Sequence, residues 1–227
     1  MIKVFEGIVI RQTKIVGGRR MLLIFTREEG KLSAGTHLSE KSKGGAALAL
    51  RPFAYGQYTV SGKRAESGSV TAAETLDAHF ALGEDADRFA EASFVLEFTD
   101  RMLPDGVSEP EIFDLLKEYL GIIARRKSDF RLLTISYLVK VMQILGVFPD
   151  VSPVAGVAAA PAGSDLLSDL NDDILKEVSY IAEQPLKRME TLTLERGKEK
   201  AIFDAIRGFA YRHLELGPMK SEQLLNN

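Results

Sequence analysis

The chain has 227 residues, a net charge of −3 and no cysteine, and 45% of its residues are hydrophobic. It can bury a core in one large or two small domains, whereas disulfides and cysteine-ligated zinc are excluded. The three histidines are too scattered for a metal site, and the longest small apolar run, residues 154–160, is far below the roughly 20 residues of a membrane span. We expect a soluble, cytoplasmic protein without a metal.

Charge is distributed unevenly along the chain. Residues 1–80 hold 12 Lys and Arg against 7 Asp and Glu, a net charge of +5, and residues 81–227 hold 17 against 25, a net charge of −8. A basic lobe of this size commonly binds phosphate, although an ordinary solvated surface with a chance excess gives the same count. We expect two domains, with a boundary at residues 80 and 81.

The first domain is predicted to consist of five strands. Leu22–Thr26 is apolar on both faces, which is typical of a buried strand, and Arg27–Gly30 turns the chain into a hairpin. Further strands are expected at residues 4–11, 31–35, 55–61 and 69–75. Gly7 lies in the middle of the first, where a bent barrel strand often has no side chain. Five short strands with one long connection, residues 36–50, favour an OB-fold barrel.

The second domain is predicted to be an all-α bundle, which makes the fold class α+β. Apolar residues at helical spacing predict helices at residues 85–103, 108–126, 129–146, 166–183 and 195–214. Ser108 and Glu111 form a capping-box pattern, and the helix at 129–146 is apolar almost all round, as a central helix should be. Residues 149–165 are rich in proline, glycine and alanine, so we expect a flexible loop there.

Cations of the first domain are the candidate DNA contacts, because a groove that follows the phosphate backbone needs positive charges spaced along one face. The candidates are Arg11, Lys14, Arg19, Arg20, Lys41, Lys43 and Arg51. Tyr55, Tyr58 and Phe53 are possible base-stacking rings, although an aromatic residue on a barrel strand more often belongs to the core. For each single cation, a solubilising surface charge is an equal alternative.

The order of several motifs resembles one family, the bacterial recombination mediator RecO. The resemblance covers both ends and most of the chain, through Gly7–Ile10, Leu22–Thr26, Glu29–Lys31, Leu50–Phe53, Ala92–Phe98, Tyr211–Leu214, Pro218–Ser221 and Leu224–Leu225. It implies an OB-fold followed by a helical domain. It also implies binding of single- and double-stranded DNA without sequence specificity, annealing of complementary strands, and help from RecR in loading RecA on DNA coated by single-strand-binding protein.

The resemblance also implies protein partners for the helical domain, namely RecR and the acidic, apolar C-terminal tail of single-strand-binding protein. Cations that could hold the carboxylates of that tail are Arg125, Arg126, Lys127, Arg131, Lys140 and Lys220. The cluster at 125–127 could equally cap a helix C-terminus, and Lys220 could remain in solvent. Many relatives carry a four-cysteine zinc module in the middle of this domain. The present chain has Pro149–Leu170 there, so the zinc module is absent.

No enzymatic site is predicted. Residues 56–64 (GQYTVSGKR) look like a phosphate loop, but five residues separate the glycines and Arg64 replaces the magnesium-binding hydroxyl. No serine lies in the local context of a catalytic nucleophile. We therefore expect a non-catalytic, nucleoid-associated DNA-repair mediator without a nucleotide cofactor. The alternatives are an adaptor whose barrel binds protein instead of DNA, and a hydrolase with an unrecognised site.

Overall fold

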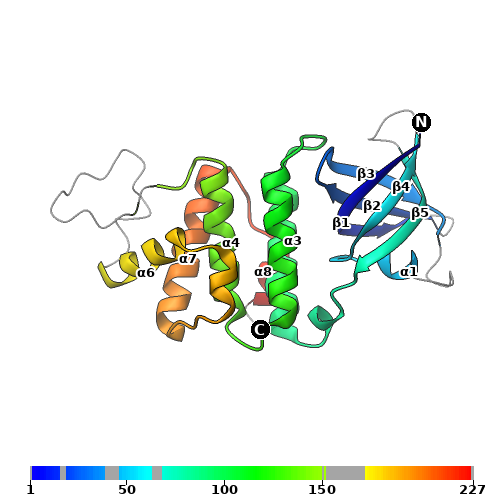
Figure 1. Ribbon diagram of the computed structural model, residues 1–227. Helices are drawn as coiled ribbons and strands as arrows, with labels where there is room; N and C mark the ends of the chain where they lie inside the picture. The colour runs from blue at the N-terminus through cyan, green and yellow to red at the C-terminus, as the bar shows by residue number, and fades with distance from the viewer. Residues whose placement is uncertain are drawn as a thin grey trace.

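The computed structural model describes residues 2–15, 19–38, 46–62, 68–149, 151 and 172–225. A five-stranded barrel comes first and helices follow, which confirms the α+β fold (Figure 1). The strands are β1 (Ile2–Lys14), β2 (Arg20–Thr26), β3 (Gly30–Thr36), β4 (Tyr55–Ser61) and β5 (Gly68–Asp77), with the short helix α1 (Ala46–Ala49) between β3 and β4. The helical part contains η3 (Phe80–Gly83), α2 (Ala86–Met102), α3 (Pro110–Arg125), α4 (Phe130–Ile144), α6 (Asp172–Glu183), η4 (Leu186–Glu190), α7 (Arg196–His213) and α8 (Glu222–Leu225).

The barrel closes in the order β1-β2-β3-β5-β4, the ring predicted for an OB-fold. Its neighbours pair antiparallel except for β3 and β5, which meet in a short parallel ladder at Ala34–Thr36. Gly7 lies where β1 crosses β2. A side chain on Gly7 would collide with Ile24, which explains why the bent strand has a glycine there.

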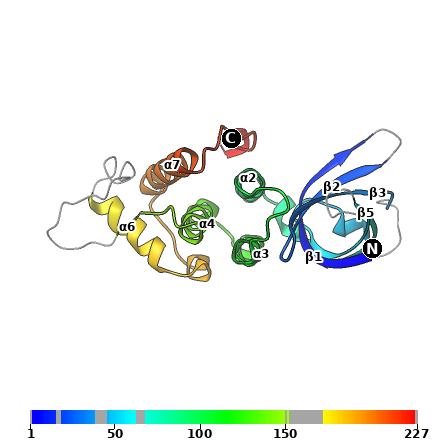
Figure 2. The same ribbon diagram turned by 90° about the horizontal axis from the view of Figure 1, so that it is seen from above.

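Strand β2 is buried on both faces, as its sequence predicts. Leu22 and Ile24 belong to the core inside the barrel, whereas Leu23 and Phe25 belong to the core shared with the helices. The rings of Phe25 and Phe113 on α3 meet edge to face at 5.5 Å. Figure 2 shows α2 and α3 beside the barrel, with α4 next and α6 and α7 farthest away. Strand β2 therefore contributes side chains both to the core inside the barrel and to the core between the barrel and the helices.

Helix boundaries agree with the sequence pattern at most ends, but the predicted capping box is wrong. The N-cap of α3 is Glu109, which makes no side-chain capping bond. The hydroxyl of Ser108 instead donates to the carbonyl of Arg27 in the β2–β3 turn, at 3.0 Å. In contrast, Asp85 caps α2 by accepting a hydrogen bond from the amide of Arg88 at 2.9 Å. Ser108 thus connects the helices to the barrel.

The central position of α4 is confirmed, since almost all of its side chains are buried. Gly146, with φ of 69°, follows its C-terminus, where a left-handed residue ends a helix without strain. Of the loop predicted at 149–165, only residues 149 and 151 are among the described residues. Residues 166–171 of the next predicted helix also lie outside them, and the described helix α6 begins at Asp172.

Candidate nucleic-acid interface

The hairpin of β1 and β2 gathers cations at one end of the barrel. Lys14 lies directly opposite Arg20 in the antiparallel register, and Arg19 immediately precedes Arg20. Like charges directly opposite each other in a sheet repel each other. Figure 2 shows this hairpin projecting beyond the ring of strands. In OB-folds the β1–β2 loop commonly takes part in binding oligonucleotides.

Arg11 also lies on β1, where it is three residues before Lys14 and therefore points to the opposite face of the strand; its exposed side chain reaches toward helix α2. Its guanidinium lies 3.7 Å from a carboxylate oxygen of Asp100, and 64% of its side chain is exposed. Strands rise about 3.3 Å per residue, which puts Lys14 about 10 Å farther along β1. Arg51 is exposed near the start of β4. Lys41 and Lys43, predicted in the same set, lie outside the described residues.

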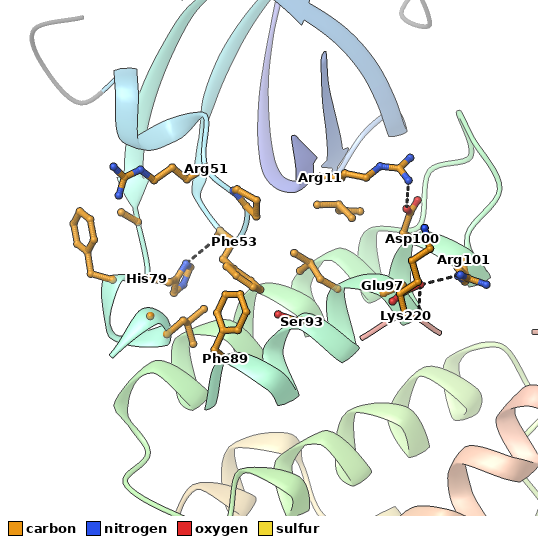
Figure 3. A pocket seen from close by; sticks show the side chains of 17 residues that line it. Arg11, Arg51, Phe53, His79, Phe89, Ser93, Glu97, Asp100, Arg101 and Lys220 are labelled. Carbon is orange, nitrogen blue, oxygen red and sulfur yellow. Dashed lines mark hydrogen bonds and ion pairs between the residues drawn. The ribbon is translucent and has the colours of Figure 1, made fainter. Parts of the chain in front are cut away.

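A pocket of about 790 Å³ separates the barrel from α2, and we call it the junction pocket (Figure 3). Its barrel side includes Arg11, Arg51 and Phe53, and its helical side includes Phe89 and Lys220. The complete lining is Ile10, Arg11, Arg51, Pro52, Phe53, Ala78, His79, Phe80, Leu82, Gly83, Phe89, Ser93, Leu96, Glu97, Asp100, Arg101 and Lys220. The pocket thus combines apolar walls with arginines and a lysine.

The placement of Tyr58 and Tyr55 contradicts a stacking role for these two rings. Tyr58 is completely buried inside the barrel, where its hydroxyl donates to the carbonyl of Ala49 at 2.7 Å. Burial raises the pKa of this phenol well above its ordinary value. Tyr55 faces α3, where the ammonium of Lys117 lies 4.1 Å from the ring centroid and also donates to the phenol oxygen at 2.7 Å. Neither ring has a face open to a base.

Phe53 is the predicted stacking ring that does line the junction pocket. It has φ of 72°, and His79, which also lines the pocket, has φ of 46°. A positive φ is an outlier for a bulky residue. Two hydrogen bonds hold this conformation: the amide of Phe53 donates to the carbonyl of Val9 at 2.9 Å, and Nδ1 of His79 lies 2.9 Å from the carbonyl oxygen of Phe53.

The acidic side chains of the junction pocket already form hydrogen bonds or ion pairs within the protein. Glu97 accepts hydrogen bonds from Arg101 and from the backbone amides of Lys220 and Ser221. Although burial opposes ionisation, these bonds hold the pKa of Glu97 below its ordinary value. Asp100 pairs with Lys31 at 3.1 Å and faces Arg11. A negatively charged ligand would therefore meet cations in the pocket more than free carboxylates.

Two of the predicted partner-binding cations are used inside the helical part. Arg126 is 5% exposed, and its guanidinium donates to the carbonyls of Ser128, Met189 and Leu192. It therefore ties the end of α3 to the η4 region, and its burial keeps it from a partner's carboxylate, which corrects the prediction. Lys140 donates to the carbonyl of Ala182 at 2.6 Å, and burial lowers its pKa.

The other predicted partner cations are more accessible. Arg125 is 64% exposed in its side chain and lies 3.5 Å from Glu190, and Lys127 is exposed. Arg131 is partly buried against Glu91 at 2.8 Å. Lys220 is exposed, on the rim of the junction pocket. The six cations therefore do not form one cluster.

Sequence reasoning missed two residues of the junction pocket, Phe80 and Phe89. Phe80 is 58% exposed and Phe89 is 42% exposed. Phe89 fits the helical spacing of α2 and reads as a core residue from sequence. The sequence feature that could have identified Phe89 as a pocket residue is its position near the N-terminus of the first long helix after the barrel.

Within the described ranges, no group of His, Cys, Asp and Glu has the arrangement of a metal site, and no helix is long and apolar enough to cross a bilayer. The absence of cysteine from the whole sequence excludes a cysteine-ligated zinc.

Comparison with known proteins accounts for nearly the whole chain. Residues 1–79 match the family model described as recombination protein O N terminal, and residues 83–223 match recombination protein O C terminal. The DNA repair protein RecO of Desulforudis audaxviator is 25% identical over 94% of this chain and 92% of its own length. That of Pelotomaculum thermopropionicum is 24% identical over 92% and 88%. That of Bacillus cereus (strain B4264) is 30% identical over 66% and 59%.

Proposed function

The chain belongs to the RecO family of DNA repair and recombination proteins, and from this premise we propose that its barrel binds single- and double-stranded DNA without sequence specificity and anneals complementary strands. RecO proteins are recombination mediators and not enzymes. We assign the phosphate contacts with DNA to residues 1–80 and the contacts with partner proteins to residues 81–227.

The observation that carries this proposal is the set of exposed cations on β1 and at the end of the β1–β2 hairpin. Arg11, Lys14 and Arg19 have exposed side chains, and Lys14 lies opposite Arg20. These charges are spread around the hairpin and are not gathered around one point. Exposed cations of this kind bind backbone phosphate without reading bases, which supports binding without sequence preference.

Annealing follows from the same electrostatics. Two DNA strands repel each other through their phosphates, and a cationic surface that binds both lowers this repulsion. No covalent bond changes, so the reaction needs neither a nucleotide cofactor nor a metal. The proposed role of the protein is to hold strands close together while bases pair.

The helical part carries the proposed contacts with RecR and with the tail of single-strand-binding protein, and through them helps to load RecA. Its negative net charge makes it a poor surface for DNA. Arg125, Lys127 and Lys220 are the exposed cations of the predicted set and are our candidates for carboxylates of that tail. Arg126 is left out because its donors are used internally.

Binding of a short single strand, measured by fluorescence anisotropy across a salt series, tests the DNA proposal. The test variant is Arg11→Glu/Lys14→Glu/Arg19→Glu. Each phosphate contact on a single strand contributes about 0.7 to the slope of log affinity against log salt, so three lost contacts should reduce the slope by about 2. We expect weaker binding at every salt concentration and the smaller slope.

The matched control reverses the same number of charges on the helical part, in Lys187→Glu/Arg188→Glu/Arg212→Glu. These three side chains are exposed on η4 and α7. If the control weakens binding as much as the barrel variant, the effect reflects net charge alone and the assignment to the barrel fails. Absence of binding by the unaltered protein at low salt would favour the adaptor alternative.

A further inference from the structure

The junction pocket exposes two large aromatic side chains in its lining. Phe80 and Phe89 both line it and are 58% and 42% exposed. Single exposed hydrophobic residues are ordinary, but two rings in one concave site mark a binding surface. Phe53 meets Phe89 edge to face at 5.7 Å, and Figure 3 shows the two rings side by side within the pocket.

We propose that the junction pocket binds one or two unstacked bases of a single DNA strand, a subsite that rests on the proposed DNA-binding function. Phe80 and Phe89 are the stacking rings, and Arg51 and Arg11 contact the phosphates on either side. Stacking on aromatic rings tolerates every base, because every base has a π-face. The subsite therefore adds affinity for single strands without adding sequence preference.

The backbone supports this assignment. Phe53 and His79 both have positive φ, and Nδ1–H of His79 donates to the Phe53 carbonyl while the Phe53 amide donates to the carbonyl of Val9. Strained residues of this kind concentrate at ligand sites, where the surrounding structure maintains a shape that folding alone would not favour. Here the strained pair is joined by that hydrogen bond and lies at the aromatic end of the pocket, as Figure 3 shows.

The charges of the pocket favour an anionic ligand. Four cations line it, Arg11, Arg51, Arg101 and Lys220, against the two carboxylates of Glu97 and Asp100, which gives a net charge of +2. Arg101 is paired with Glu97 and Arg11 lies 3.7 Å from Asp100. Burial lowers the pKa of His79, so its imidazole is neutral near pH 7. In the part of the chain that the structure describes, Arg51 makes no ion pair.

The spacing of the cations favours a nucleic acid over an acidic peptide. Arg51 and Arg11 lie at separate places on the barrel wall, as Figure 3 shows, and do not converge on one point as a clamp for a terminal carboxylate would. Arg11 also lies on β1, about 10 Å along the strand from Lys14. A strand leaving the pocket at Arg11 therefore runs beside the proposed DNA-binding hairpin, although Arg11 and Lys14 point to opposite faces of β1.

The test compares single-stranded and duplex DNA in the variant Phe80→Ala/Phe89→Leu. Leucine at position 89 keeps an apolar contact with Phe53, so the fold is retained. We expect the affinity for a single strand to fall about tenfold, the order of the loss of one stacked base, while duplex affinity stays within about twofold. A 2-aminopurine in the single strand should change fluorescence on binding to the unaltered protein and not to the variant.

The control Tyr180→Ala removes an exposed aromatic side chain from α6 and should change neither affinity. Equal losses for single strand and duplex, or no loss for either, would overturn the subsite while leaving the general DNA-binding proposal intact. Failure of the unaltered protein to bind either DNA would overturn both. If the variant loses only its binding of a synthetic acidic, phenylalanine-containing peptide, the pocket is a peptide site and our proposal is wrong.

Discussion

Lys31 of the barrel and Asp100 of helix α2 form a buried ion pair that joins the two parts of the molecule. The Lys31 ammonium lies 3.1 Å from a carboxylate oxygen of Asp100 and also donates to its backbone carbonyl. Only 7% of the Lys31 side chain is exposed. One cation of the basic barrel therefore stabilises the junction and is not available to DNA.

Replacing Lys31 by methionine should lower the free energy of unfolding by about 3 kcal/mol, because it leaves Asp100 poorly compensated in a partly buried site. Urea denaturation measures this. Lys3→Met is the control, since Lys3 pairs with Glu29 at 2.6 Å on the surface, where such pairs contribute about 1 kcal/mol or less. Equal losses in the two variants would show that the junction pair has no special role.

Gly30→Ala should destabilise the protein far more than Gly106→Ala. Both glycines have φ near 70°, so both substitutions place alanine in the left-handed region at a cost of about 1 kcal/mol. A Cβ on Gly30 would also collide with the backbone of Val107, whereas nothing surrounds the corresponding position at Gly106. Melting temperatures of the two variants give the comparison. Similar values would mean that the β2–β3 turn can move away from Val107.

Annealing of complementary strands should depend on the cations of the β1–β2 hairpin. In a fluorescence-transfer assay with two labelled strands, Lys14→Glu/Arg19→Glu should slow pairing at least about tenfold at low salt, because both strands lose phosphate contacts. Rates for the unaltered protein should fall steeply with added salt. A variant that binds one strand weakly but anneals at the normal rate would contradict charge neutralisation as the mechanism.

Glu97→Gln should weaken the attachment of the C-terminal segment, residues 219–225, to helix α2. The carboxylate accepts from the amides of Lys220 and Ser221, and glutamine would present an NH₂ group to one of them, at a cost of about 1–3 kcal/mol. Hydrogen exchange at residues 219–225 should accelerate. Because the folded-state pKa of Glu97 is below its ordinary value of 4.5, its stabilisation is present above that pH and is lost as the pH falls further. Glu118→Gln, an exposed substitution on α3, serves as the control.

His79 should make the protein less stable in mild acid. Burial holds its pKa below the ordinary value of 6.5, despite Asp77 at 3.6 Å, so the unfolded chain binds the proton more readily. Stability is then independent of this group above about pH 6.5 and decreases as the pH falls through the folded-state pKa. His79→Asn tolerates the left-handed backbone and should remove that part of the pH dependence. Denaturation midpoints between pH 5 and 7.5 measure the difference.

The fold could be predicted where local periodicity matches the final environment. Leu22–Thr26 is apolar on both faces because both faces are buried, and the strand at Tyr55–Ser61 has the predicted bounds. The capping box at Ser108 failed because a tertiary contact with Arg27 competes for the same hydroxyl. A sequence pattern shows the hydrogen-bond partners that are close in the chain, but not those that folding brings from a distant segment.

The candidate site was harder to predict, for reasons visible in individual side chains. Tyr55 and Tyr58 are three residues apart and therefore face opposite sides of β4, but only the structure shows that one side is the barrel interior and the other is covered by α3. Arg126 looks like part of a surface cluster, yet its partners are carbonyls of Met189 and Leu192, far along the chain. Phe89 has the spacing of a core residue but faces a pocket.

Because both faces of β2 are buried, the barrel is a poor candidate for study as a separate fragment. A fragment cut between the barrel and η3 would expose Leu23, Phe25, Ile8 and Ile10, which the helices now cover. Such an apolar strip on an isolated barrel invites self-association. Thermal unfolding of barrel and helices should accordingly occur as one cooperative transition, and function is better separated by point substitutions in the intact chain than by truncation.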